Sequence, residues 1–260
     1  MTNPHESKHP VISSIFIALV PVVFLSIAGA FMSVGNLDDM QSFGVQTIAC
    51  ALSILVGLLI VRQTGVSLKA IGFSKPEQGS SKRVFYYLPI IVLVAVMLLV
   101  GFYDQNNTPR VLILLVFTLL VGINEELFYR GIILQRMQKI GIKKAILIAA
   151  LIFGILHAAN LLGGYKSLLY VVIQVTFAFG FGLVAAEIAV ITKSLFPVII
   201  WHFLHDFISL ITSQSLDTTA FVILIAQVVI MIILAVVFWR KIDSTAPLMA
   251  DKTFDKVAER

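Results

Sequence analysis

Ionisable side chains lie within three stretches of the chain that are otherwise apolar enough to cross a lipid bilayer. They are Glu125, Glu126, Arg130, His157, His202 and Asp206. A charged residue at the centre of a spanning helix costs about 2.5–3.5 kcal/mol on insertion scales. A chain that keeps several of them on separate segments is expected to use them. These residues are therefore the candidate functional site.

The acidic pair in the first stretch has two different predicted environments. On an α-helix, Glu126 and Arg130 are four residues apart and share a face, so they can pair. Glu125 is rotated by about 100° from Glu126 and is expected to remain unpaired. An unpaired carboxyl group removed from water suits a general base that works near neutral pH. For Glu126 and Arg130, a purely structural role, in which their buried salt bridge locks two helices together, is as good an interpretation as a functional one.

The histidines extend the candidate site to the other two stretches. His202 has Asp206 four residues further on, within reach on the same helix face. A carboxylate beside an imidazole fixes the tautomer and raises the basicity of the ring. His205 lies about 60° from His202 around the helix and is a second candidate for that role. A lone histidine such as His157 can also be a hydrogen-bonded packing residue.

Three helices that carry these side chains can converge on one polar cavity, where two kinds of chemistry are open. The group could activate a water molecule and stabilise an oxyanion, or it could bind a divalent metal such as zinc. The possible ligands are Glu125, His157, His202 and Asp206. The soluble zinc-protease motif His-Glu-x-x-His is absent. From the residues alone, hydrolysis and the transport of ions or protons are close rivals.

The composition predicts an all-α, polytopic membrane protein. Of the 260 residues, 59% are hydrophobic and 13% are charged, whereas soluble domains have about 45–50% apolar and about 25% charged residues. Apolar runs of about 20 residues are long enough to cross the hydrocarbon core. We predict eight spans, at 11–34, 42–61, 84–103, 110–135, 145–162, 168–192, 195–213 and 220–239.

The basic residues predict the orientation of these spans. All but three of the 19 Lys and Arg residues fall on one side of the predicted membrane, and the exceptions are Arg110, Arg130 and Lys166. Because positive residues gather on the cytoplasmic side, both termini are predicted to be cytoplasmic and the protein to lie in the plasma membrane. This distribution explains the net charge of +5 without a nucleic-acid partner.

The whole chain, 1–260, is predicted to form a single integral membrane domain. Its catalytic core would occupy about 110–213, and a polar cytoplasmic tail would occupy 240–260. Gly180 and Gly182 suit close approach between helices. The sequence makes no prediction of oligomeric state.

Three motifs resemble those of the CAAX prenyl endopeptidase and bacteriocin-processing (CPBP, Abi) family of intramembrane proteases. The family has Glu-Glu-x-x-x-Arg, then Phe-x-x-x-His, then His-x-x-x-Asn or Asp. Here the motifs read Glu125-Glu126-Leu-Phe-Tyr-Arg130, Phe153-Gly-Ile-Leu-His157 and His202-Phe-Leu-His-Asp206. Each motif alone is weak, but all three occur in order on three separate hydrophobic segments. The resemblance covers about 120–210.

The resemblance implies roles for the motif residues. Glu125 and His157 would activate the attacking water, and His202 and Asp206 would hold the oxyanion or assist from the opposite side. The implied catalytic set is Glu125, Glu126, His157, His202 and Asp206, with Arg130 as structural support. The family includes both metalloproteases and metal-free glutamate proteases. Its substrates include prenylated CAAX proteins, peptide pheromones, bacteriocin precursors and the tails of membrane proteins.

The sequence therefore predicts an intramembrane endopeptidase that cleaves a peptide or membrane-protein substrate at the bilayer. Two other classes remain as alternatives. A non-catalytic bacteriocin-immunity or scaffold protein would keep the same residues only for packing. A proton-coupled carrier would use them to move protons. The complete motif set favours the endopeptidase.

Overall fold

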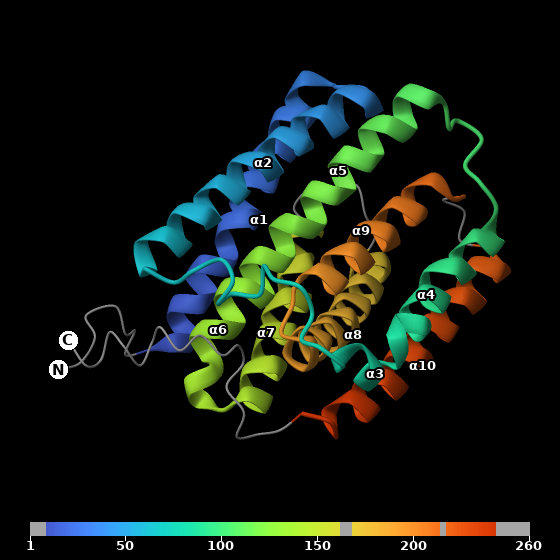
Figure 1. Ribbon diagram of the computed structural model, residues 1–260. Coiled ribbons are helices and arrows are strands. Elements are labelled where there is room, and N and C mark those ends of the chain that lie inside the picture. The colour runs from blue at the N-terminus through green and yellow to red at the C-terminus, as the bar shows by residue number, and fades with distance from the viewer. Residues whose placement is uncertain (1–8, 162–167, 214–216, 243–260) are drawn as a thin grey trace.

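The computed structural model describes residues 9–161, 168–213 and 217–242, and these residues are mostly helical, with no strand among them (Figure 1). The predicted all-α class is confirmed. The long helices are α1 (Pro10–Gly35), α2 (Asp39–Thr64), α5 (Thr108–Glu126), α7 (Ile142–Leu156), α8 (Leu168–Thr192), α9 (Phe196–Ile211) and α10 (Thr218–Trp239). The short elements are α3 (Ser80–Arg83), η1 (Phe85–Tyr87), α4 (Leu88–Ala95), η2 (Val96–Val100), η3 (Leu127–Ile133), α6 (Leu134–Met137), η4 (Gln138–Ile140) and η5 (His157–Leu161).

Each predicted span corresponds to an apolar helical segment. Within the described ranges, six segments are long and apolar enough to cross a membrane: Pro10–Gly35, Asp39–Thr64, Thr108–Ile140, Ile142–Ala159, Val171–Thr192 and Thr218–Trp239. The other two, Phe85–Val100 and Phe196–Ile211, are shorter apolar helices. At about 1.5 Å per residue, a helix of 16 residues covers about 24 Å, less than the roughly 30 Å hydrocarbon core. The chain is therefore a polytopic membrane protein in which two of the predicted spans are short.

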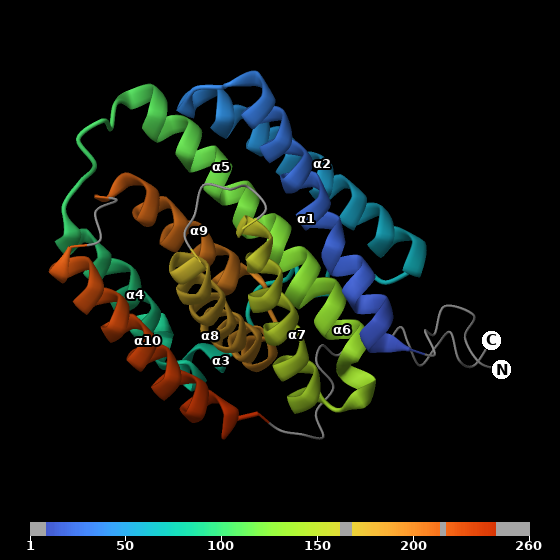
Figure 2. The ribbon, with the colours of Figure 1, turned by 180° about the vertical axis from the view of Figure 1, so that it is seen from behind.

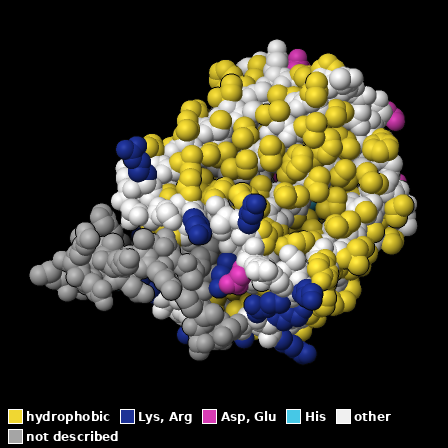
Figure 3. Space-filling view, in the orientation of Figure 1, with side chains coloured by type: hydrophobic (Ala, Val, Ile, Leu, Met, Phe, Trp, Pro, Cys, Tyr) yellow, Lys and Arg dark blue, Asp and Glu magenta, His cyan; other side chains and the backbone are white. Residues whose placement is uncertain are grey.

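The helices form a bundle whose middle contains the helices that carry the motifs. In both ribbon views, α5, α7, α8 and α9 lie between the α1–α2 pair and the α4–α10 pair, and α5 packs on both α2 and α9 (Figures 1 and 2). The outward faces carry exposed apolar side chains such as Phe16 and Leu99, which are 68% and 73% exposed. This apolar exterior is visible in Figure 3 and suits contact with lipid, because a bilayer solvates such side chains and leaves the helices to satisfy their own backbone hydrogen bonds.

Basic side chains gather at one end of the bundle. On the face shown in Figure 3, most Lys and Arg side chains lie toward the margin where α3, α6 and the end of α2 are found in Figure 1. The first residue of α1 and the last residue of α10 also lie toward this end. Lys8, Lys166 and the predicted tail beyond residue 242 lie outside the described residues.

The chain between α5 and α6 departs from ordinary α-helix. η3, which directly follows Glu126, is a π-helical segment in which all seven residues are buried. Such segments are rare and occur frequently at functional sites. The predicted span 110–135 is therefore one long helix, Thr108–Ile140, with its hydrogen-bonding pattern changed just after the acidic pair.

Glycines allow the central helices to approach closely. A Cβ atom on Gly122 of α5 would lie 3.2 Å from the backbone O of Ile199 on α9, and one on Gly154 of α7 would lie 2.9 Å from the Cβ of Phe179 on α8. Gly182 is similarly tight, since its Cβ would lie 3.1 Å from the Phe153 ring, whereas Gly180 is not tight. These contacts bring the helices that carry the motif residues together.

We expect Gly154→Ala to destabilise the protein by about 1–3 kcal/mol, because the added methyl group meets the Phe179 backbone as well as its side chain. The measurement is the melting temperature in detergent. The matched control is Gly29→Ala in α1, where a Cβ would have nothing within 4 Å and the alanine favours the helix. Equal melting temperatures for the two variants would contradict the close α7–α8 contact.

Candidate active site

Glu126 and Arg130 form a buried ion pair next to the start of η3. The Arg130 Nη1 atom donates to Glu126 Oε1 at 2.8 Å, and the two side chains are 1% and 0% exposed. The guanidinium carbon lies 4.4 Å from the centre of the Phe153 ring, which is a cation–π contact. The predicted pairing of these two residues is confirmed, and α7 contributes the aromatic face that covers the cation.

Glu126 also bonds to a histidine on another helix. His202 of α9 has its Nδ1 atom 2.8 Å from Glu126 Oε1, the same oxygen that binds Arg130. Because a carboxylate only accepts, Nδ1 carries the hydrogen, and Nε2 is the atom that faces the rest of the site. The sequence suggested Asp206 as the carboxylate beside His202. Its Oδ2 atom lies near Nε2 at 3.5 Å, but the hydrogen bond that orients the ring comes from Glu126.

Glu125 points to the same imidazole and keeps an oxygen without a partner. Its Oε2 atom lies 3.5 Å from His202 Nε2 and makes no hydrogen bond within the described part of the chain. The side chain is 15% exposed. Glu126 also has an Oε2 atom without a hydrogen-bond partner among the described residues, but its Oε1 atom accepts two hydrogen bonds and its side chain is fully buried. The two adjacent glutamates therefore differ in exposure and in the bonding of the carboxylate, and Glu125 is the one that water can reach.

His157 joins the cluster from the end of α7. It is the first residue of η5, and its Nδ1 atom lies 2.8 Å from the Phe153 carbonyl oxygen. The carbonyl can only accept, so Nδ1 donates and Nε2 is left as an acceptor. The ring packs edge-on against Phe153 with 4.7 Å between ring centres, and the same Phe153 ring lies 6.3 Å from the ring of His202. The helix of the predicted span 145–162 changes to a 3₁₀ turn at this residue.

Asp206 lies at the more exposed side of the cluster, with a side chain that is 30% exposed. Its Oδ2 atom faces His202 Nε2 at 3.5 Å, and its Oδ1 atom lies 3.3 Å from Nδ1 of His205. The structure therefore brings all six predicted side chains into one group, from α5, η3, η5 and α9. His205 joins this group without replacing His202.

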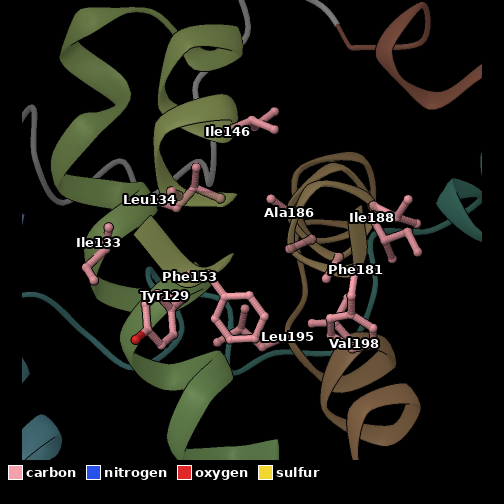
Figure 4. Close-up of a cluster of buried hydrophobic side chains, with 14 of the residues drawn as sticks. Tyr129, Ile133, Leu134, Ile146, Phe153, Phe181, Ala186, Ile188, Leu195 and Val198 are labelled. Carbon is pink, nitrogen blue, oxygen red and sulfur yellow. The ribbon is translucent and has the colours of Figure 1, made fainter. Parts of the chain in front are cut away.

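Aromatic residues of α8 were missed by the reasoning from sequence. Phe181 packs on His202 at 4.9 Å and on Trp201 at 4.1 Å, and Phe177 stacks on His205 at 5.2 Å. Phe153 and Phe181 face each other across the buried cluster drawn in Figure 4. The available signal was the spacing of Phe177 and Phe181, which are four residues apart and share a helix face.

The donor set contains the atom types that zinc prefers, which are histidine nitrogens and carboxylate oxygens. Within residues 9–161, 168–213 and 217–242, however, no three His, Cys, Asp or Glu side chains are placed so that they could ligate one ion. His202 has Nδ1 engaged by Glu126, and its Nε2 lies 3.5 Å from both other carboxylates.

Residues 106–208 match the family described as Type II CAAX prenyl endopeptidase Rce1-like. The matched segment begins just before α5, ends within α9 and contains all three motifs. Comparison with curated proteins and with solved structures gave no match. At the level of the family, the match supports a CAAX-type intramembrane protease. The resemblance to the CAAX prenyl endopeptidase and bacteriocin-processing family is therefore confirmed, and the part of this multi-pass membrane protein that carries the site is Rce1-like.

Proposed function

We propose that the protein is an intramembrane endopeptidase of the glutamate type that hydrolyses a peptide bond in a lipidated or membrane-associated substrate. One observation carries the proposal. Glu125 holds a carboxylate oxygen that makes no hydrogen bond to any described residue and lies 3.5 Å from Nε2 of His202, inside a segment that matches a protease family. A base and a donor that lie side by side can act on the attacking water and on the carbonyl oxygen of one substrate.

The proposed reaction begins with a water molecule bound between Glu125 and His157. Glu125 takes a proton from the water, and the water oxygen forms a bond to the carbonyl carbon of the substrate. The carbonyl π electrons move to its oxygen, which His202 stabilises by donating from Nε2. The electrons of the oxyanion then re-form the C=O bond as the C–N bond breaks, and Glu125 passes its proton to the departing amine. The products are a new amino terminus and a new carboxylic acid, which releases the second water proton to solvent.

The remaining residues of the cluster hold these groups in place. Glu126 accepts from Nδ1 of His202, and the three carboxylates around this ring favour its imidazolium form, in which Nε2 donates as well. Arg130 neutralises Glu126 and rests on Phe153. The Phe153 carbonyl fixes His157 with its Nε2 lone pair available.

We further propose that the basic end of the bundle faces the cytoplasm and that the protein lies in the plasma membrane. The gathering of Lys and Arg toward one end supports this orientation. The substrates that suit this arrangement are prenylated proteins ending in a CAAX sequence, or peptide precursors such as pheromones and bacteriocins, presented from the lipid. No nucleic-acid partner is needed to explain the charge.

The test is incubation of the purified protein, in lipid nanodiscs, with farnesylated CAAX peptides and with leader peptides, followed by mass spectrometry. We expect one new fragment pair whose masses identify the cleaved bond. A parallel sample with a chelator should retain full activity, and loss of activity that returns with zinc would favour a metalloprotease instead. Intact peptides in every sample, together with pH-driven ion flux in liposomes, would favour the carrier.

A further inference from the structure

None of the three motifs specifies a histidine at position 205, yet His205 packs within the cluster. It occupies the third position inside the His202-x-x-x-Asp206 motif of α9, and its side chain is 16% exposed. Two rings of α8 enclose it. It stacks on Phe177 with 5.2 Å between ring centres and an interplanar angle of 28°, and it lies 5.9 Å from Phe181. A ring held in this way has a fixed direction for its nitrogens.

The fixed direction points Nδ1 of His205 at Asp206. The Nδ1 to Oδ1 distance is 3.3 Å, while Oδ2 of the same carboxylate lies 3.5 Å from Nε2 of His202. Each oxygen of Asp206 therefore faces a different imidazole. Since a carboxylate only accepts, His205 is the donor in its contact. The contact sets the rotation of the Asp206 carboxylate and so sets how it faces His202.

We propose that His205 is a positioning residue, which donates from Nδ1 to Asp206 and so keeps the other oxygen of that carboxylate facing Nε2 of His202. The proposal rests on the proposed function, in which Nε2 stabilises the oxyanion. An unbonded carboxylate beside a developing oxyanion would repel it. A hydrogen bond from His205 draws negative charge toward Oδ1, on the side away from the reacting oxygen.

Three variants separate this role from packing. His205→Phe keeps a ring between Phe177 and Phe181 but has no donor. His205→Asn has an amide nitrogen near the position of Nδ1 but lacks the ring. We expect the phenylalanine variant to lower kcat about 10- to 100-fold with little change in KM, and the asparagine variant to stay within about threefold of wild type. The control is Leu204→Phe, whose side chain is 37% exposed and which should leave kcat unchanged.

The dependence on Asp206 is tested by combining the variants. Asp206→Asn places an amide that can itself donate, so in that background His205→Phe should change kcat less than about threefold. An equal loss in both backgrounds, or no loss in either, would overturn the proposal. A loss of kcat in His205→Asn as large as in His205→Phe would show that only the ring matters, which also overturns it.

A spectroscopic measurement is independent of the proposed function. In protein labelled with ¹⁵N-histidine, the Nδ1–H signal of His205 is identified by its loss in His205→Phe. We expect this signal to shift in Asp206→Asn, and an unchanged signal would overturn the hydrogen bond. If the wild-type protein cleaves no peptide while the signal shifts, the function fails and the positioning contact stands. If the protein cleaves and His205→Phe matches wild type, only the inference fails.

Discussion

Glu125→Gln is expected to lower the rate of peptide cleavage about 10²- to 10⁴-fold, the range lost when a general base is removed. The substitution keeps the shape of the side chain but replaces the unpartnered oxygen that accepts the proton from water. Because Oε2 has no hydrogen-bond partner in the described protein, its loss breaks no bond that supports the fold. The melting temperature should therefore stay within a few degrees of wild type.

The matched control is Glu187→Gln in α8. Glu187 is also a buried carboxyl group in a spanning helix, with 0% exposure and no hydrogen-bond partner for either oxygen among the described residues. It lies outside the cluster, so its conversion to an amide should leave the cleavage rate within about twofold of wild type. Cleavage is measured with the peptide identified by mass spectrometry. Equal losses in the two variants would mean that the rate depends on buried carboxyl groups in general and would remove Glu125 as the base.

This contrast also separates the protease from the non-catalytic alternative. A scaffold or immunity protein would keep Glu125 for packing, so its substitution should lower the melting temperature and leave the biological effect in place. A protease should show the reverse. The contact of Glu125 with His202 is 3.5 Å long, which is too long to contribute much to stability as an ordinary hydrogen bond. Loss of the carboxylate is therefore expected to lower the cleavage rate and not the melting temperature.

Much of the fold follows from the sequence because hydropathy and lipid impose strong constraints. Apolar runs in a bilayer must satisfy their own backbone hydrogen bonds, so they form helices of the observed number and order. The third predicted span, 84–103, shows where this reasoning stops. Phe85, Tyr86 and Tyr87 have positive φ angles of 53°, 51° and 63°, which hydropathy does not reveal. The apolar segment Phe85–Val100 consequently begins with a left-handed turn, Phe85–Tyr87, and only α4 and η2 after it are regular helix.

The site was predictable at the level of residue types and only partly at the level of contacts. Spacing along one helix correctly paired Glu126 with Arg130, because residues four apart share a face. It could not show that His202 bonds to Glu126, since the two residues are 76 positions apart. The π-helical segment that begins at Leu127 could not be predicted either, because side-chain directions inferred from spacing hold only for a regular α-helix. Contacts between helices depend on packing of glycines and aromatic rings that no single segment encodes.

The shared oxygen of Glu126 connects stability to orientation of the histidine. One oxygen accepts from both Arg130 and His202 at 2.8 Å, so a single carboxylate neutralises a buried cation and fixes an imidazole. The two roles can be separated by substitution. The ion pair can be replaced by apolar side chains of similar size, whereas the acceptor for His202 cannot.

Arg130→Met is accordingly expected to destabilise the protein by about 3–5 kcal/mol, the cost of leaving one partner of a buried ion pair alone. Glu126 would remain 0% exposed with only His202 to neutralise it. The melting temperature should fall by about 10 °C, and the fluorescence of Trp201, which is 2% exposed and packs on Phe181, provides the measurement. Cleavage should fall with the loss of fold.

The double variant Glu126→Met/Arg130→Met should recover most of the melting temperature, because apolar residues of similar volume replace a buried ion pair at little cost. Its cleavage rate should remain about 10- to 100-fold below wild type, since Nδ1 of His202 has lost the acceptor that orients it. A double variant as unstable as Arg130→Met would mean that Glu126 supports the fold by something other than the pair. A stable and fully active double variant would show that the direction of His202 is set by its aromatic neighbours, Phe153 and Phe181, and that Glu126 has no part in catalysis.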